Sequence, residues 1–216
     1  MMDELRYKPL VDHYETCLEQ HGAIPKGVDW PNARDLSTRF NVMLDISRNH
    51  HPRHPMALLD LGCGYGALLD HINALQQIKR FTYHGIDMSP KMIQAAINRH
   101  PNHFFEERNI LTNPLSSSSV DYVLMNGLFT EKRSLTQAEM TQFFIKMVQN
   151  SFKASRIGIA FNVMSTHVDW MRDDLYHLPF DEMVSILHKH CSRHLTIRSD
   201  YGLYEYTVYV YQHANC

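Results

Sequence analysis

The stretch ALLDLGCGYGA, residues 57–67, decides the fold. Its first five residues are apolar except for Asp60, which is typical of a short buried strand. Gly62, Gly64 and Gly66 follow at alternate positions, and apolar residues then recur at helical spacing, at Leu68, Leu69, Ile72 and Leu75. The pattern predicts strand, tight turn and helix, and the missing side chains let a ligand approach the backbone of the turn closely.

Strands and helices continue to alternate after this unit. The helices begin at capping residues: Ser89 stands before Pro90, and Thr136 forms a capping box with Glu139. Further short apolar strands are predicted at residues 81–86, 103–106, 120–125 and 156–163. Such alternation predicts a mostly parallel sheet with helices on both faces and a ligand beyond the carboxyl ends of the strands.

The two ends of the chain depart from this alternation. Residues 7–18 and 36–44 carry apolar side chains at helical spacing ahead of the first strand. After a last helix, residues 195–199 and 204–211 predict two strands separated by a tight turn around Gly202. We therefore predict a doubly wound, mostly parallel seven-stranded α/β sheet with a C-terminal antiparallel hairpin and an N-terminal helical lid.

Length and composition limit the possible functions of the protein. The 216 residues fit a single domain, in which we expect residues 1–50 to form the helical lid segment and residues 51–216 the main domain. The formal net charge is −2, with 21 Lys and Arg against 23 Asp and Glu, and like charges form no block. Neither nucleic acid nor a membrane surface is therefore an expected partner.

Cysteines and histidines indicate no metal centre. The four cysteines are scattered without a CxxC pair, which is typical of free thiols in a reducing compartment. Several of the 15 histidines lie beside prolines in residues 49–55, where we expect a solvated loop and no metal site. The chain has no apolar run that could span a bilayer and no signal peptide, so a cytoplasmic location is expected.

Asp87 is the second residue that points to a ligand. It follows Gly62 by 25 positions and ends the second predicted strand, where a carboxylate can accept hydrogen bonds from both ribose hydroxyls of a nucleoside. The same glycines also satisfy G-x-G-x-x-A through Ala67, so by themselves they are compatible with a dinucleotide-binding enzyme.

Three motifs carry a resemblance to a known family. LLDLGCGYG (58–66), YHGIDMSPKMIQAA (83–96) and VDYVLMNGLF (120–129) resemble the first, second and fourth motifs of class I S-adenosylmethionine-dependent methyltransferases, in the same order and spacing. The resemblance implies a Rossmann-like methyltransferase fold for residues 51–216 and S-adenosyl-L-methionine as the cofactor.

The resemblance also implies a set of cofactor-binding residues. Gly62, Cys63 and Gly64 would contact the methionine part through their backbone, and Asp60 would help to hold its ammonium group. Asp87 would bind the ribose and Met88 would pack on the adenine. Asn109 and Ile110 belong to a stretch, RNILTNPLSSSSVDYV (108–123), that resembles the third motif, although Asn109 stands where an Asp is usual. Asn126 would lie beside the sulfonium, where Leu128 and Phe129 are either further site residues or core.

The N-terminal stretch GVDWPNARDLSTRFNVMLDI (27–46) resembles a subset of the family whose leading helices fold over the cofactor. Arg39 would then pair with the carboxylate of the methionine part. Tyr14, Trp30 and Arg34 are further candidates on the same segment.

The sequence defines the binding site of the methyl acceptor less closely than that of the cofactor. If the acceptor is a hydroxyl, a base is useful, and His167, with His177 as a second candidate, follows the fifth strand where this fold places acceptor-facing groups. Residues 165–179 are the expected acceptor lid, whereas Tyr201 and Glu205 are interpreted as structural. The small charge and compact length favour a small-molecule acceptor, methylated on O or N, and a monomer or weak homodimer.

Two alternatives stay open at this point. One is a non-catalytic methyltransferase-like binding subunit, which the intact glycine turn does not exclude. The other is an NAD(P)-dependent oxidoreductase, which predicts dinucleotide affinity in place of affinity for S-adenosylhomocysteine.

Overall fold

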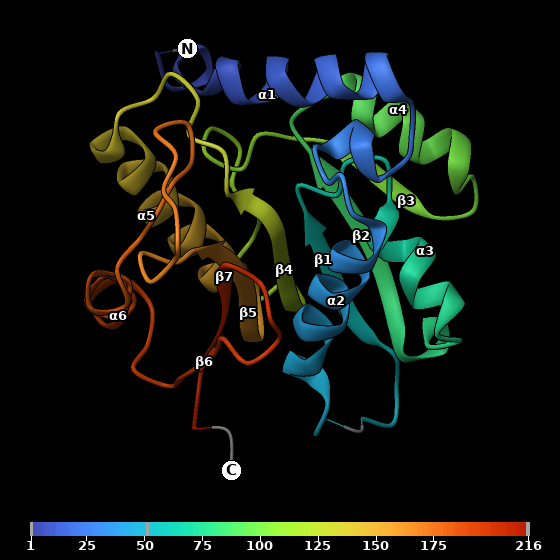
Figure 1. The fold of residues 1–216 in the computed structure, drawn as a ribbon. Coiled ribbons are helices and arrows are strands. Elements are labelled where there is room, and N and C mark those ends of the chain that lie inside the picture. Colours follow the sequence, from blue (N-terminus) through green and yellow to red (C-terminus); the bar gives the residue numbers. More distant parts are fainter. Residues whose placement is uncertain (1, 51, 215–216) are drawn as a thin grey trace.

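The structure is a computed structural model that describes residues 2–50 and 52–214 (Figure 1). The strands are β1 (Met56–Leu61), β2 (Phe81–Asp87), β3 (Phe104–Glu107), β4 (Val120–Phe129), β5 (Ser155–Met164), β6 (Leu195–Arg198) and β7 (Glu205–Tyr211). The α-helices are α1 (Met2–His21), α2 (Ala33–Leu44), α3 (Ala67–Ala74), α4 (Pro90–Arg99), α5 (Gln137–Ala154) and α6 (Phe180–His190). Short 3-10 helices are η1 (Pro25–Val28), η2 (Asp45–Ser47) and η3 (Ile78–Arg80).

The seven strands form one sheet in the order β3-β2-β1-β4-β5-β7-β6. Neighbouring pairs from β3 to β5 are parallel, while β7 runs antiparallel to both β5 and β6. This confirms the predicted doubly wound sheet with a C-terminal antiparallel hairpin. The strand order reverses between β1 and β4, which is where open α/β sheets bind their ligands.

Two apolar clusters fill the faces of the sheet, because successive side chains of a strand point to opposite sides. Leu59 on β1 belongs to the cluster covered by α5 and α6, with Phe144 at its centre. The adjacent Leu58 belongs to the cluster covered by α2, α3 and α4. Helices therefore cover both faces, as the alternation in sequence predicts.

The predicted helix starts are present with their caps. The Ser89 hydroxyl accepts a hydrogen bond from the Met92 N–H at 3.1 Å, and Pro90 opens α4. Thr136 and Glu139 form the complete capping box of α5. These local bonds satisfy N–H groups that a helix start leaves unpaired.

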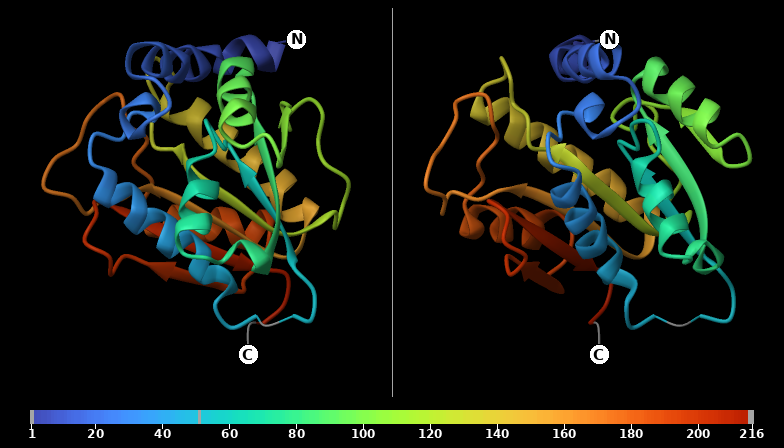
Figure 2. Two further views of the ribbon diagram at one scale, coloured as in Figure 1. Left: turned by 90° about the vertical axis from the view of Figure 1, so that its right-hand side faces the viewer. Right: turned by 45° about the vertical axis from the view of Figure 1, so that its right-hand side comes forward.

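The first fifty residues serve two different purposes. α2 belongs to the core: Phe40 and Met43 are buried, and Tyr209 on β7 donates its hydroxyl hydrogen to the Val42 carbonyl. α1 and η1 instead lie across the end of the sheet to which β4 points (Figures 1 and 2). Within the segment predicted as a lid, only α1 and η1 therefore cover the carboxyl ends of the strands. Among the described helices, none combines the length and apolar character needed to cross a bilayer.

Candidate active site

The N–H groups of the turn between β1 and α3 are hydrogen-bonded to the end of β2. Gly62 and Cys63 both donate to the Ile86 carbonyl, at 2.7 and 3.0 Å, and Gly64 donates to Oδ2 of Asp87 at 2.9 Å. Gly62 and Gly64 have φ of +77° and +54°, in the left-handed region that favours glycine. A glycine-rich turn that binds a pyrophosphate needs free N–H groups, and these three are already hydrogen-bonded.

Asp87 ends β2 and holds the loop that follows. Besides the Gly64 N–H, its carboxylate accepts the Ser89 N–H on Oδ1 at 2.9 Å. Burial raises the pKa of Asp87, and the two N–H donors counteract that increase. Each carboxylate oxygen retains a second lone pair for a ligand hydroxyl.

Two adjoining cavities open at this end of the sheet. The larger holds about 930 Å³ of atom-free space, part of it open to solvent, and the smaller about 360 Å³. Both are lined by Val28, Trp30, Gly62, Gly64 and Asn126. The five shared residues mean that the two spaces share a wall.

Most residues predicted from sequence meet at these cavities. The smaller cavity is lined by Asp60, Gly62, Cys63, Gly64 and Asn126. The larger is lined by Gly62, Gly64, Asp87, Met88, Ile110 and Asn126. Parallel strands bring these separate stretches to one edge because their carboxyl ends lie together.

Two predicted cofactor residues lie elsewhere. Arg39 lines neither cavity; its Nε donates to both carboxylate oxygens of Glu205, and its guanidinium stacks 3.8 Å from the centre of the Trp30 ring. The side-chain Oδ1 of Asn109 accepts a hydrogen bond from the Leu111 N–H at 2.9 Å and so stabilises the turn that contains both residues. Each side chain thus has a protein partner, while Nη1 of Arg39 and Nδ2 of Asn109 are buried without a hydrogen-bond partner among the described residues.

The predicted bases are not at the cavities either. His167 is exposed and stacks on Phe180, with ring centres 5.6 Å apart. His177 is buried, donates from Nδ1 to the Ser165 carbonyl at 2.7 Å, and has no hydrogen-bond partner for Nε2 among the described residues. No residue of the expected acceptor lid, 165–179, lines either cavity. Arg34 is exposed and Phe129 lies in the core.

The larger cavity is instead roofed by α1 and the segment after it. Tyr14 and Trp30, both candidates from sequence, line it, and the Tyr14 hydroxyl donates to the Gly127 carbonyl at 3.4 Å. Leu128 and Glu131 complete the wall after β4. Glu131 was not predicted as a site residue, because it lies after the motif VDYVLMNGLF. With Arg133 two residues later, the stretch is typical of a solvated turn.

Asp60 supplies the carboxylate among the described residues that line the smaller cavity. It is 3% exposed and accepts a hydrogen bond from the Tyr83 hydroxyl at 2.6 Å. Burial raises its pKa to about 7, and the Tyr83 hydrogen bond offsets part of that increase. A cationic group in the smaller cavity would favour the ionised form of this carboxylate.

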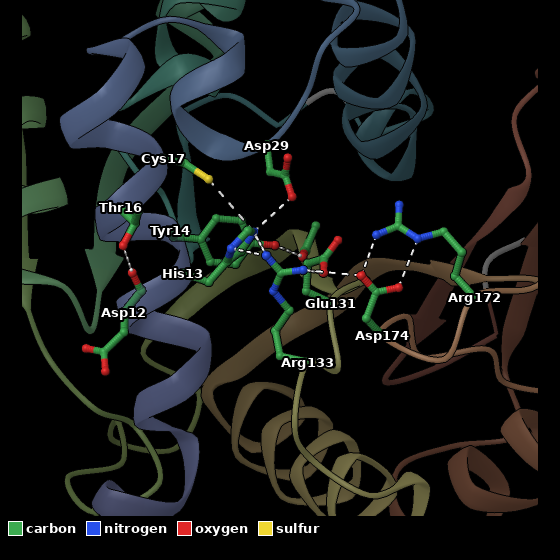
Figure 3. A network of polar contacts seen from close by, with 11 residues as sticks. Asp12, His13, Tyr14, Thr16, Cys17, Asp29, Glu131, Arg133, Arg172 and Asp174 are labelled. Carbon is green, nitrogen blue, oxygen red and sulfur yellow. Dashed lines mark hydrogen bonds and ion pairs between the residues drawn. The ribbon is translucent and has the colours of Figure 1, made fainter.

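A cluster on the outer side of Tyr14 contains potential metal ligands (Figure 3). His13, Cys17 and Asp29 lie within 4.8 Å of one another, the imidazole bonding Asp29 at 2.8 Å. The guanidinium of Arg133 contacts the same imidazole. Burial raises the pKa of the Cys17 thiol, which disfavours the thiolate that a metal needs. With an arginine cation already in place, the cluster has the character of a hydrogen-bonded network.

The cavities fit a nucleoside with a cationic, amino acid-like tail. Asn126 has a buried Oδ1 without a hydrogen-bond partner among the described residues, and it lines both spaces. A Cβ at Gly62 would lie 2.8 Å from Leu128, so the Leu128 side chain packs closely against this glycine. The carboxylates of Asp60 and Asp87 stand in different cavities, which matches a ligand with an ammonium at one end and ribose hydroxyls at the other.

Comparison with known proteins agrees with this geometry. The family model described as "Methyltransferase domain" matches residues 53–190. "Putative methyltransferase Rv1506c" of Mycobacterium tuberculosis (strain H37Rv) is 33% identical over 161 residues, which cover 72% of this chain and 93% of that protein.

Solved structures share the fold at low sequence identity. One is 1,6-didemethyltoxoflavin-N1-methyltransferase of Burkholderia thailandensis, solved with its substrate and S-adenosylhomocysteine (TM-score 0.63, 12% identity, 94% of this chain and 86% of that chain). Another is magnesium protoporphyrin IX methyltransferase of Synechocystis with S-adenosylhomocysteine (TM-score 0.62, 12% identity, 98% and 97%).

Fold, motifs and family model define the class of protein as the class I S-adenosylmethionine-dependent methyltransferases. The chain belongs to the methyltransferase-domain family, whose model covers more than half of its length.

Proposed function

We propose that the protein transfers the methyl group of S-adenosylmethionine in line to an oxygen or nitrogen nucleophile of a small-molecule acceptor. The observation that carries the proposal is the pair of adjoining cavities, with Asp60 in one, Asp87 in the other and Asn126 in both.

In this arrangement the smaller cavity holds the methionine part of the cofactor. Asp60 pairs with the ammonium group, and carbonyl oxygens of the turn at Gly62 and Cys63 supply further acceptors, since the N–H groups there are engaged. Asp87 binds the ribose hydroxyls, while Met88 and Ile110 pack against the adenine in the larger cavity. The sulfonium then lies near Asn126, the residue common to both spaces.

The cofactor supplies an activated methyl group on a sulfonium, so the protein has mainly to orient the acceptor and exclude water. The roof of α1 and Trp30 covers the larger cavity, and its apolar lining disfavours water there. Tyr14 fixes the roof to β4 through the Gly127 carbonyl. The residues around Asn126 then hold the nucleophile in line with the breaking bond.

The size and lining of the larger cavity favour a small acceptor. Apolar side chains from α1 and α5 enclose it, at Tyr7, Leu10, Val11, Phe143 and Met147. Such a lining suits an apolar body of the acceptor, as in most small-molecule sites. The net charge of −2 gives no basic surface for nucleic acid.

The hydrogen bonds of the glycine turn argue against the nicotinamide alternative, because a pyrophosphate there would find the N–H groups of Gly62, Cys63 and Gly64 occupied. Only a measurement of methyl transfer distinguishes the proposed enzyme from a non-catalytic binding subunit. The domain boundary at residue 51, the cytoplasmic location and the monomeric or weakly dimeric state stay predictions from sequence.

Isothermal titration of the purified protein with S-adenosylhomocysteine tests the proposal, with NAD(H) and NADP(H) as parallel titrations. We expect binding of S-adenosylhomocysteine alone. Binding of a dinucleotide in its place would overturn the cofactor assignment. Methyl transfer from labelled S-adenosylmethionine to a panel of small hydroxyl and amine compounds then separates an enzyme from a binding subunit.

A further inference from the structure

Glu131 is a buried carboxylate that cofactor binding does not use. It lines the larger cavity and is 7% exposed. Its Oε2 forms an ion pair with the guanidinium of Arg133 at 3.4 Å but accepts no hydrogen bond from the described residues. The other carboxylate on this lining, Asp87, has backbone N–H groups on both oxygens. A buried carboxylate oxygen without a donor is costly, so Glu131 is available for a ligand group.

The backbone around Glu131 is held firmly by the segment after β5. Glu131 pairs with Leu175 in an isolated antiparallel bridge, and Tyr176 donates its N–H to the Thr130 carbonyl at 2.8 Å. The N–H groups of the two residues after Glu131 donate to the Asp174 carbonyl, at 2.7 and 2.9 Å. The segment predicted as an acceptor lid therefore acts as a support that fixes the position of Glu131.

Tyr14 lies beside Glu131 and binds the end of β4. Its hydroxyl donates to the Gly127 carbonyl, next to Asn126, and Figure 3 shows its side chain beside Glu131 and Arg133. Glu131, Tyr14 and Asn126 thus line the same cavity, and Tyr14 is bonded to the residue that follows Asn126.

We propose that Glu131 is the general base of the reaction and that the acceptor is an uncharged hydroxyl or amine compound with an apolar body. This rests on the proposed function. The Glu131 carboxylate takes the proton of the O–H or N–H group as the nucleophile forms its bond to the methyl carbon. The carbon–sulfur bond breaks, its electron pair returns to sulfur, and S-adenosylhomocysteine, methylated acceptor and protonated Glu131 result.

The charges around Glu131 suit this role. Burial raises its pKa to about 7, and the guanidinium of Arg133, 3.4 Å from Oε2, limits that increase. The carboxylates of Asp29 and Asp174 raise the pKa of Glu131, and the guanidinium of Arg172 lowers it. The nearby Tyr14 on α1 is a neutral phenol, because burial raises the pKa of Tyr14. A base is most effective when its pKa is close to the working pH.

The same carboxylate selects among acceptors. A carboxylic acid is ionised at neutral pH, needs no base, and would place a like charge beside Glu131 and Asp87. A phenol, alcohol or neutral amine instead offers a hydrogen to Oε2 of Glu131, which accepts no hydrogen bond from the described residues. The apolar residues of α1 and α5 then pack against the rest of the molecule.

The test uses tritiated S-adenosylmethionine with paired acceptors that share one ring or chain and carry a hydroxyl, an amine or a carboxylate. We expect transfer to hydroxyl or amine members only. Glu131→Gln should lower kcat about 10²- to 10⁴-fold, remove the acidic limb of the kcat profile near pH 7, and leave S-adenosylhomocysteine affinity unchanged. Glu131→Asp should recover part of the rate, and Glu182→Gln, the same change on the exposed face of α6, should have no effect.

A kcat for Glu131→Gln within threefold of the parent, or transfer to carboxylates, overturns the proposal, as does an equal loss of cofactor affinity, which marks a structural role. If no acceptor in the panel turns over, ¹³C NMR of labelled glutamate in the S-adenosylhomocysteine complex decides, with Glu131→Gln identifying the signal. Titration of Glu131 near neutral pH supports the base; titration near the ordinary glutamate value removes it. Lack of S-adenosylhomocysteine binding by the parent protein is a different result, because it defeats the proposed function itself.

Discussion

Arg39 on α2 and Glu205 on β7 form a buried ion pair, in which the arginine Nε lies 2.9 and 2.8 Å from the two carboxylate oxygens. Asn162 on β5 extends the pair by donating to Glu205 at 2.9 Å and accepting the Gly127 N–H at 2.7 Å. The network therefore runs from a core helix, through two strands, to the irregular end of β4 that borders the cavities.

Removing one member of this pair should destabilise the protein. Arg39→Met leaves the Glu205 carboxylate buried with only Asn162 as a side-chain donor, and such a loss costs about 3–5 kcal/mol. Adding Glu205→Gln removes the charge and should recover a large part of the loss. Urea unfolding of the single and double variants measures both effects. Equal stability of the two variants would contradict the coupling.

The folded double variant also tests the role first predicted for Arg39. If its S-adenosylhomocysteine affinity equals that of the parent protein, Arg39 acts through the fold alone. A tenfold weaker affinity would instead support a contact with the cofactor carboxylate.

Asp87→Ala should weaken S-adenosylhomocysteine binding by more than about tenfold, because ribose hydroxyls lose their acceptor on desolvation. The variant also removes the acceptor of the Gly64 and Ser89 N–H groups. Asp87→Asn keeps one carbonyl oxygen and serves as the milder comparison. Calorimetric titration of both variants checks this, and unchanged affinity in a folded Asp87→Ala protein would remove Asp87 from the site.

Cofactor affinity should depend on pH through Asp60. Its pKa of about 7 in the free protein means that Asp60 carries a proton in part of the population at neutral pH and in most of it below. Because a ligand ammonium favours the ionised form, binding below pH 7 releases a proton, and affinity should fall by up to roughly tenfold per pH unit. Titrations from pH 5.5 to 8 should show this slope. Asp60→Asn should flatten it, and a slope that persists in that variant would point to another group.

Stability should depend on pH through Glu131, with a defined sign. Its pKa is about 7 in the folded protein against 4.5 when unfolded, so between these values only the folded state keeps the proton. Stability is therefore full below pH 4.5 and falls as pH rises toward 7, by about 3 kcal/mol at most. Relative to the parent protein, Glu131→Gln should gain stability between pH 5 and pH 8. A constant difference across that range would contradict the raised pKa.

Gly127→Ala should disturb the roof of the larger cavity. The added Cβ would lie 3.0 Å from the Trp30 ring, and φ of +76° is strained for alanine, at about 1–2 kcal/mol. Gly202→Ala has the same φ with open space around it, so it carries the strain without the clash. We expect Gly127→Ala to lose more stability than Gly202→Ala, and only Gly127→Ala to weaken S-adenosylhomocysteine binding. Equal binding by both would show that Trp30 is dispensable.

The parts of the site that were predictable are those built from local sequence. The glycines at 62 and 64 and the carboxylate of Asp87 sit at strand ends, and the alternation of strands and helices brings those ends together. Their positions follow from motif and topology without any knowledge of side-chain partners.

The remaining residues depend on contacts between distant parts of the chain. Arg39 and Glu205 are separated by 166 positions, so no local pattern indicates that they pair. Asn109 was predicted as a cofactor-binding residue, yet its side-chain carbonyl accepts the Leu111 N–H two residues later. Glu131 is buried by α1 on one side and supported by residues 174–176 on the other, which a linear pattern cannot reveal.

Different parts of the chain position the residues proposed to bind the cofactor and the wall that contains Glu131. The proposed donor site comprises the turns after β1 and β2. The wall beside Glu131 is instead positioned by Asp174, Leu175 and Tyr176, a stretch that lines neither cavity. Changes in the length or composition of that stretch can shift the acceptor wall without altering the donor turns. A directed library confined to residues 172–178 is accordingly a route to new acceptor preferences at constant donor affinity.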